Sequence, residues 1–162
     1  MHRNTAIISL LIICILLFSL PVSAAAEDKG PLPHASEFSA MLGMTAEVVF
    51  SKPEIPESIF PYRGITPEED NVVFYYPDSI YLFWFQNRIW QVRADERWTG
   101  DVDGVRMGMS YQDVTELWGS PINTRDDNPT WTLPDQGYPV RIRLYFSKTG
   151  MLNDMYVYRA DW

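Results

Sequence analysis

Apolar and polar residues alternate strictly in VRIRLYF, residues 140–146. A period of two is typical of a β-strand that buries one face and leaves the other open. Other runs are rich in β-branched and aromatic residues and are separated by turn-forming pairs, so they predict further strands. The expected strands cover residues 71–76, 79–85, 88–93, 130–133, 140–146 and 151–159.

A helical pattern precedes the second group of strands. Ser110 is a good N-cap, and Asp113 follows three residues later, as in a capping box with a shorter acid. An apolar stripe then runs to Gly119, which ends the expected helix. A second helix can start after Thr45, but Pro53 must end it early or bend it. Residues 66–69, TPEE, predict one short helical turn.

A repeated motif divides the chain into two similar halves. Residues 43–45, GMT, recur as GMS at 108–110, a spacing of 65 residues. Each copy of the motif precedes a helix signal and then a group of strands. The sequence therefore predicts an α+β domain over residues 41–162, with two tandem helix-plus-three-strand repeats at 41–95 and 105–159. The repeats should form one antiparallel sheet with the helices packed on one face.

The alternation also predicts which side chains are buried. In the second repeat the core face should carry Val140, Ile142, Leu144, Phe146, Met155 and Val157. Matching Phe85 to Phe146, and Val92 to Val157, transfers the rule to the first repeat. There the expected core residues are Tyr81, Phe83, Phe85, Trp90 and Val92. The expected open-face residues are Leu82, Trp84, Gln91 and Arg93.

The open face gathers residue types that dominate protein interfaces. Trp, Tyr and Arg bury large areas and keep a polar group, so they carry much of the energy of protein–protein contacts. The predicted partner-binding residues are Trp84, Arg93, Arg141, Arg143, Tyr145, Tyr156 and Tyr158. Arg-Tyr pairs also stabilise ordinary solvent-facing sheets, and Leu82 or Trp84 could be covered by the lead-in segment or by the 94–106 connection.

The first 24 residues have the order of a secretory signal peptide. Arg3 precedes the apolar run AIISLLIICILLFSL, and small residues follow up to Ala24. The run is shorter than the about 20 apolar residues that cross a bilayer, and Pro21 follows it directly. We expect residues 1–24 to be cleaved and residues 25–40 to form a flexible polar lead-in. The mature protein should have no membrane span and should be periplasmic or secreted.

The residues left after cleavage exclude much chemistry. Cys14 is the only cysteine, and Ile13 before it does not fit a lipidation site. Of the two histidines, His2 lies in the signal and His34 in the lead-in. Ser-His-Asp, Cys-His and most zinc mechanisms need these groups. The acidic turn Asp101–Gly104 lacks the further ligands of a calcium loop, so we expect no catalytic residue, no metal and no cofactor.

Charge excludes a further class of partner. The whole chain has a formal net charge of −8. Loss of Arg3 leaves 12 basic residues against 21 acidic ones, which is about nine net negative charges. A polyanion such as DNA or RNA is therefore not an expected partner.

The order of motifs resembles a known family. The elements that carry the resemblance are GMSYQDVTELWGSP, its weaker counterpart TAEVVFSKPEIP, and the aromatic strands that follow. Together they resemble BamE (SmpA/OmlA), a family of small outer-membrane assembly lipoproteins. Two copies in one secreted chain resemble the β-lactamase inhibitory protein fold, whose concave, aromatic sheet face grips a protein. Two departures are the missing lipidation cysteine and the missing disulfides, so β-lactamase inhibition is not implied.

These observations predict a non-catalytic, exported protein-binding module that uses its aromatic and arginine-rich sheet face. Its role would be inhibitor-like, or it would act in assembly at the cell envelope. The alternatives are a carbohydrate-binding protein, whose aromatic rings would stack on sugars, and a glycoside hydrolase that uses two carboxylates. The sequence does not identify such a carboxylate pair.

Overall fold

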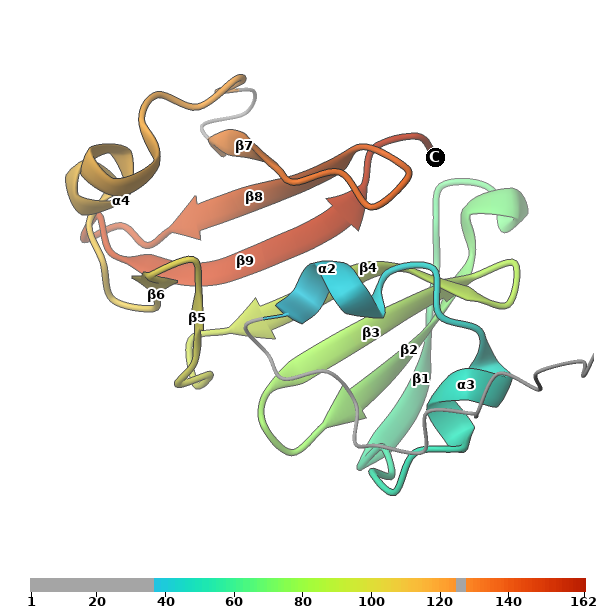
Figure 1. Cartoon of the computed structure of the whole chain (residues 1–162). Helices are drawn as coiled ribbons and strands as arrows, with labels where there is room; N and C mark the ends of the chain where they lie inside the picture. The colour runs from blue at the N-terminus through green and yellow to red at the C-terminus, as the bar shows by residue number, and fades with distance from the viewer. Residues whose placement is uncertain (1–36, 125–127) are drawn as a thin grey trace, which may run out of the picture.

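A seven-stranded antiparallel sheet forms the centre of the fold (Figure 1). The computed structural model describes residues 37–124 and 128–162. In spatial order the strands are β1 (Ser58–Tyr62), β2 (Asn71–Tyr76), β3 (Ile80–Phe85), β4 (Arg88–Asp95), β9 (Leu152–Arg159), β8 (Val140–Phe146) and β7 (Thr130–Leu133). A separate two-stranded ribbon consists of β5 (Asp101–Val102) and β6 (Val105–Arg106).

The helices are short. They are α2 (Phe38–Met41), α3 (Ala46–Phe50), the 3-10 turn η2 (Pro67–Glu69) and α4 (Tyr111–Trp118). The capping box of α4 is confirmed: the amide of Asp113 donates to Ser110 Oγ at 3.2 Å, and the amide of Ser110 donates to Asp113 Oδ2 at 2.8 Å. The early end of α3 is also confirmed, since it stops before Pro53.

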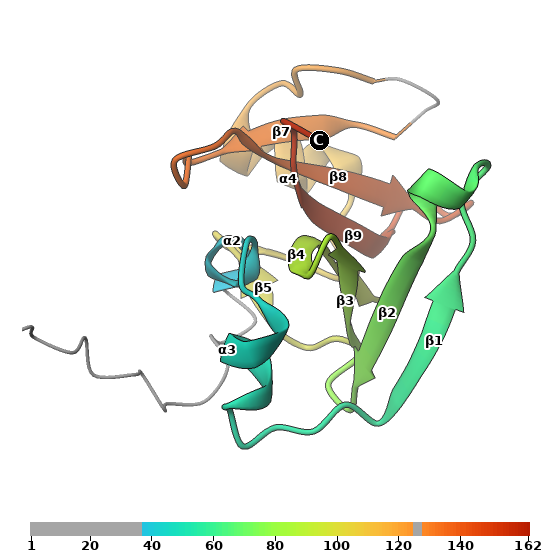
Figure 2. The same cartoon turned by 90° about the vertical axis from the view of Figure 1, so that its right-hand side faces the viewer.

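The hydrophobic core lies between the sheet and the elements packed against one of its faces (Figure 2). Phe38 of α2, Val49 of α3 and Val114 of α4 are each 1% exposed or less. Trp98 and Val105 close the core from the connection between β4 and α4. The sheet contributes fully buried residues to the same cluster, namely Leu82, Val92, Ile142, Leu144, Met155 and Val157.

The predicted fold class, two tandem helix-plus-three-strand repeats, is wrong. The fold is mostly sheet, and β1 is a seventh strand that the sequence did not predict. The helices of the two halves are also unequal, because α3 has 5 residues and α4 has 8. Strand β1 was not predicted because Pro61 lies within it, and proline within an apolar run argues against a strand. Proline is tolerated here because β1 is an edge strand.

The recurring Gly-Met motif nevertheless makes equivalent local contacts in the two halves. The amide of Gly43 donates to the carbonyl of Ile89 at 2.7 Å, and the amide of Gly108 donates to that of Leu152 at 2.8 Å. Both glycines have φ near +80° (80° and 85°), a conformation that residues with a Cβ rarely adopt. The 65-residue spacing therefore marks two similar turns that dock on strands β4 and β9.

The proposed signal peptide, residues 1–24, lies outside the described residues, as does most of the proposed lead-in at 25–40. The last residues of that lead-in, 37–40, are described, and Phe38 among them is buried in the core. In the described ranges, no helix is both long and apolar enough to span a membrane.

Candidate functional site

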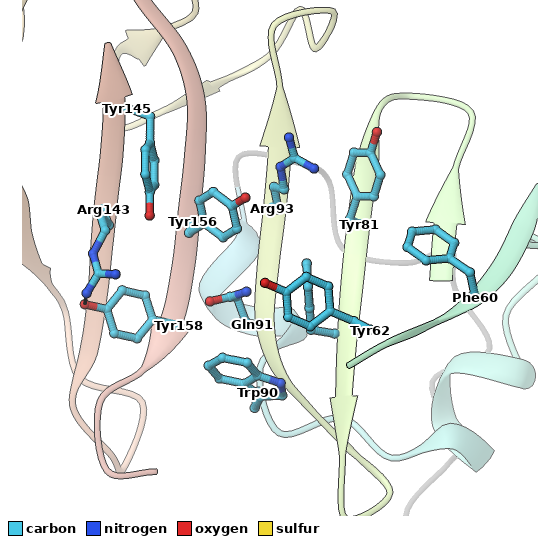
Figure 3. A pocket seen from close by; sticks show the side chains of 11 residues that line it. Phe60, Tyr62, Tyr81, Trp90, Gln91, Arg93, Arg143, Tyr145, Tyr156 and Tyr158 are labelled. Carbon is cyan, nitrogen blue, oxygen red and sulfur yellow. Dashed lines mark hydrogen bonds between the residues drawn. The ribbon is translucent and has the colours of Figure 1, made fainter. Parts of the chain in front are cut away.

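A hollow of about 530 Å³ lies on the face of the sheet opposite the core (Figure 3). We call it the aromatic hollow. Eight of its eleven lining residues are Tyr, Phe or Trp, and the lining comes from strands β1, β3, β4, β8 and β9. The lining consists of Phe60, Tyr62, Tyr81, Phe83, Trp90, Gln91, Arg93, Arg143, Tyr145, Tyr156 and Tyr158.

Cross-strand register explains why these side chains share one face. Tyr81 pairs with Arg93, Phe83 with Gln91, and Arg93 with Tyr156 across β3, β4 and β9. Directly opposed residues of neighbouring antiparallel strands point to the same face. The neighbouring pairs, Leu82 with Val92 and Val92 with Val157, point to the core.

The predicted faces of β3 are reversed in the structure. Leu82 is fully buried and Trp84 is 7% exposed, and both belong to the core cluster rather than to the open face. Tyr81 and Phe83, expected in the core, line the aromatic hollow instead. Phe85 is only half-buried, and its ring contacts that of Trp162 at 5.3 Å between centroids.

Trp90 also departs from the prediction because β4 contains an irregularity. Ile89 pairs with Trp84, but Gln91 pairs with Phe83, so Trp90 is the extra residue of a β-bulge. A bulge re-aims the side chains around it, and here both Trp90 and Gln91 face the hollow. The indole N–H of Trp90 donates to Asn71 Oδ1 at 2.7 Å, which fixes the ring at that position.

Phe83 forms the middle of an aromatic cluster and is itself 6% exposed. Its ring centroid lies 5.7 Å from that of Tyr62, 6.3 Å from Trp90 and 6.4 Å from Tyr156. Tyr145 continues the cluster at 5.2 Å from Tyr156. These separations are typical of favourable edge and tilted ring contacts, so the hollow has a continuous aromatic surface.

Arg93 is held in place by a carboxylate next to the hollow. Its Nε and Nη2 atoms donate to both oxygens of Asp154, at distances from 2.6 to 3.0 Å. The same guanidinium lies 4.7 Å from the ring centre of Tyr81 and 5.5 Å from that of Tyr156. Burial raises the pKa of Asp154, and the Arg93 guanidinium opposes that rise. Arg93 is therefore a fixed part of the hollow, already paired within the protein.

Among the described residues, Arg143 interacts with neutral phenol groups. Its Nη2 donates to the hydroxyl of Tyr158 at 3.4 Å, and its guanidinium carbon lies 5.4 Å from the centre of that ring. Tyr145, on the same strand, also interacts with this guanidinium. Among the described side chains, the ion pairs do not include Arg143. Arg143 therefore differs from Arg93, which pairs with Asp154.

The polar groups of the lining are phenols, an indole, an amide and two guanidinium groups. None of the eleven lining residues is a carboxylate, histidine, cysteine or serine. Burial raises the pKa of Tyr156 to about 12, and the nearby Asp154 acts in the same direction, so this phenol stays neutral near pH 7. Among the described residues, no cluster of three or more His, Cys, Asp or Glu side chains could hold a metal ion.

The structure brings together five of the seven residues that the sequence proposed as a partner-binding set. Arg93, Arg143, Tyr145, Tyr156 and Tyr158 all line the aromatic hollow. The placement of the other two differs. Arg141 is exposed on β8, where it pairs with Tyr158, but it lies outside the lining. Trp84 is buried on the opposite face.

Sequence reasoning missed Phe60 and Tyr62. They lie at one end of the hollow, on the unpredicted strand β1. The stretch SIFPY does place Phe60 and Tyr62 two residues apart, which is the spacing of one strand face. The sequence could therefore have predicted that both side chains point to the same face.

A polar network borders the hollow beside Tyr81. The Tyr81 hydroxyl donates to Asp95 Oδ2 at 2.8 Å, and Arg97 Nη2 donates to the same oxygen at 2.7 Å. The Arg97 guanidinium holds the pKa of Asp95 well below its usual range, and the Arg97 amide and the Tyr81 hydroxyl add to this effect.

Asp95 should therefore make folding sensitive to acid. A carboxyl whose pKa is lower in the folded than in the unfolded state adds stability above its unfolded pKa, about 3.9, and loses it as pH falls towards the folded value. Urea midpoints measured between pH 7 and pH 2.5 should fall less for Asp95→Asn than for the wild type. Asp135→Asn, at an exposed position between β7 and β8, is the control. Parallel curves for wild type and Asp95→Asn would contradict this assignment.

Comparisons with known proteins place the fold but not the function. No protein-family model matches this chain, and no curated protein matches it. The structure is similar to that of an extracellular protein containing a SCP domain from Bacillus anthracis, with a TM-score of 0.51 and 15% identity over 76% of this chain and 45% of that one. A cysteine-rich secretory protein from Staphylococcus aureus gives a TM-score of 0.48 and 13% identity over 82% of this chain and 49% of that one.

The first of these structures corrects the family resemblance expected from the sequence. It belongs to a protein containing a SCP domain, so the resemblance to BamE (SmpA/OmlA) and to the tandem β-lactamase inhibitory protein fold is wrong. The chain spans about half the length of either neighbour. At 15% identity, the first comparison shows a fold shared with part of that protein and nothing about activity.

Proposed function

We propose that this chain is an exported, non-catalytic module that binds another protein through the aromatic hollow. The observation that carries the proposal is the composition of the hollow, in which Tyr, Trp, Phe and Arg supply ten of eleven lining residues. These residue types dominate the energetics of protein interfaces. The proposal of export rests on the order of residues 1–24, and the similar protein from B. anthracis is described as extracellular.

The hollow is also largely preorganised. Arg93 is fixed by Asp154, and the indole of Trp90 is fixed by Asn71. Groups that are already ordered lose less conformational entropy when a partner binds. This favours recognition over a role in which the arginines and tyrosines only stabilise a solvent-facing sheet.

A carbohydrate ligand is the second candidate. Trp90 stands beside Gln91 in the hollow, and an aromatic ring next to an amide can stack on a sugar and hydrogen-bond its hydroxyls. A glycoside hydrolase is less well supported, because it needs two carboxylates at the site and the lining contains none.

Site-specific photo-crosslinking tests the protein-binding proposal. In the test variant, a benzophenone amino acid replaces Tyr145, which points into the hollow (Figure 3). In the control variant it replaces Tyr111, which is 43% exposed on α4. Irradiation in an extract of the producing cells should give a discrete protein adduct from position 145 and not from position 111. Excess unlabelled wild-type protein should suppress that adduct.

The double variant Arg143→Ala/Tyr145→Ala provides the matched competitor. It should fail to suppress the adduct, while its free energy of unfolding falls by only about 1 kcal/mol, since both side chains lie on the open face. Equal crosslinking from Tyr111, or full competition by the double variant, would show that the hollow is not the binding surface.

A further inference from the structure

Resting on the proposed function, we propose that the occupant of the hollow is an extended segment of the partner that carries a carboxylate. The carboxylate pairs with Arg143, and proline or aromatic side chains of the segment pack on the rings around Phe83. Three features of the hollow lead to this inference: its charge, its length and the arrangement of its rings.

The charge of the hollow is locally opposite to that of the protein. The chain has a net charge of −8, yet its hollow is lined by two arginines and no carboxylate. Asp154 already neutralises Arg93, whereas the described residues offer Arg143 only the phenols Tyr145 and Tyr158. A guanidinium presents a planar fork that matches a carboxylate. An incoming carboxylate would therefore give Arg143 the kind of partner that Arg93 already has.

The length of the hollow suits an extended peptide. Figure 3 shows Phe60 at one end and Arg143 and Tyr145 at the other. From β1 to β8 there are five steps between adjacent strands, which at about 4.8 Å each gives a span of about 24 Å. An extended chain rises about 3.3 Å per residue, so about seven residues would cross this distance. A single sugar ring would occupy only a small part of it.

The rings define where apolar side chains of the segment would lie. Tyr62, Trp90 and Tyr156 surround the nearly buried Phe83, and Tyr62 itself is 54% exposed. Aromatic-lined grooves bind proline-rich segments because a polyproline II helix has no internal hydrogen bonds and little conformational freedom to lose. This cluster lies between the Phe60 end and the Arg143 end, so apolar residues should stand several positions away from the acid in the bound segment.

Selection from random peptides tests the inference. A phage library of random dodecapeptides is panned against the whole purified protein. Wild-type selections should be enriched in Asp or Glu together with Pro, Tyr, Phe or Trp. Arg143→Glu should lose the acidic residues and select Lys or Arg instead, because the charge at that end of the hollow is reversed. Arg106→Glu makes the same charge change at an exposed position of β6 and should select the wild-type pattern.

Affinity measurements on one selected peptide complete the test. Hydrogen bonds between two charged groups are stronger than those between neutral groups, so Arg143→Gln should weaken binding about 10- to 100-fold. Replacing the acid of the peptide with its amide should weaken binding of the wild type to a similar extent. The two changes together should cost no more than either alone. Circular dichroism establishes that each variant is folded.

Three outcomes would overturn the inference. The first is that the enriched peptides lack acidic residues, or that Arg143→Glu selects the same acidic residues as the wild type. Either result would show that Arg143 does not bind a carboxylate of the segment. No enrichment, with the Tyr145 crosslink retained, would show that the partner binds as a folded surface, and the proposed function would stand. The third outcome is that no peptide is enriched, no Tyr145 crosslink forms, and the protein instead binds glycans on an array. If Tyr156→Ala abolishes that glycan binding, the proposed function is overturned as well, and the hollow recognises carbohydrate.

Discussion

Trp84→Ala is expected to lower the free energy of unfolding by about 3–5 kcal/mol, the usual cost of deleting a large buried aromatic side chain. Trp84 is 7% exposed, and its ring centroid lies 5.0 Å from that of Phe74. Both rings belong to the core cluster on the helix-covered face of the sheet. Urea unfolding followed by far-ultraviolet circular dichroism measures the change.

The same substitution separates the two faces of the sheet. Because Trp84 points away from the aromatic hollow, the folded fraction of Trp84→Ala should still compete with wild-type protein in the Tyr145 crosslinking experiment. Normal stability with loss of competition would show that Trp84 belongs to the open face after all.

Trp84→Phe is a milder control for this prediction. The indole Nε1 of Trp84 is buried and has no hydrogen-bond partner among the residues that the structure describes. Phenylalanine keeps most of the ring volume and removes that unsatisfied donor, which offsets part of the lost packing. We expect its cost to stay below about 1.5 kcal/mol, clearly less than that of alanine.

Asp154→Ala is expected to have the second largest effect, about 2–3 kcal/mol of lost stability. Removing one partner of a buried ion pair leaves the other charge without compensation and typically costs 3–5 kcal/mol. The Arg93 and Asp154 side chains are 28% and 17% exposed, so water reduces the expected penalty. Asp154→Ala should also free Arg93 to move within the hollow.

A double-mutant cycle shows how much of this cost belongs to the pair. Arg93→Met keeps an unbranched side chain of similar length beside the Tyr81 and Tyr156 rings and removes the charge. The variant Arg93→Met/Asp154→Ala should be more stable than the sum of the single changes predicts, by about 1–2 kcal/mol. Strictly additive losses would mean that the observed hydrogen bonds contribute little net stability.

The positions of six strands follow from local sequence. Residues 71–76, 130–133 and 140–146 are strands with the predicted bounds, and the other three differ by one or two residues. Alternation, β-branched residues and turn pairs are local signals that tertiary structure did not change here. The α4 capping box is equally local, since its two partners are three residues apart.

The faces of β3 could not be predicted in the same way, because they depend on register. Trp84 pairs with Ile89, and Phe146 pairs with Leu152. Since Ile89 and Leu152 accept the equivalent bonds from Gly43 and Gly108, the structural counterpart of Phe146 is Trp84. The sequence comparison matched Phe146 to Phe85, one residue further on. A slip of one residue moves every side chain of a strand to the opposite face.

The sequence by itself determined the strand positions, the helix cap, the acidic charge and the Arg-Tyr face of β8 and β9, because each depends on residues close together in the chain. Only the tertiary structure decided that β9 lies between β4 and β8, that β1 extends the sheet, and that Trp84 and Tyr81 exchange their expected faces. These features depend on pairing between residues up to about 65 positions apart. Such pairing is selected by burial over the whole sheet. A bulge at Trp90 can therefore turn side chains of β4 to the other face, although the sequence pattern of the strand gives no sign of it.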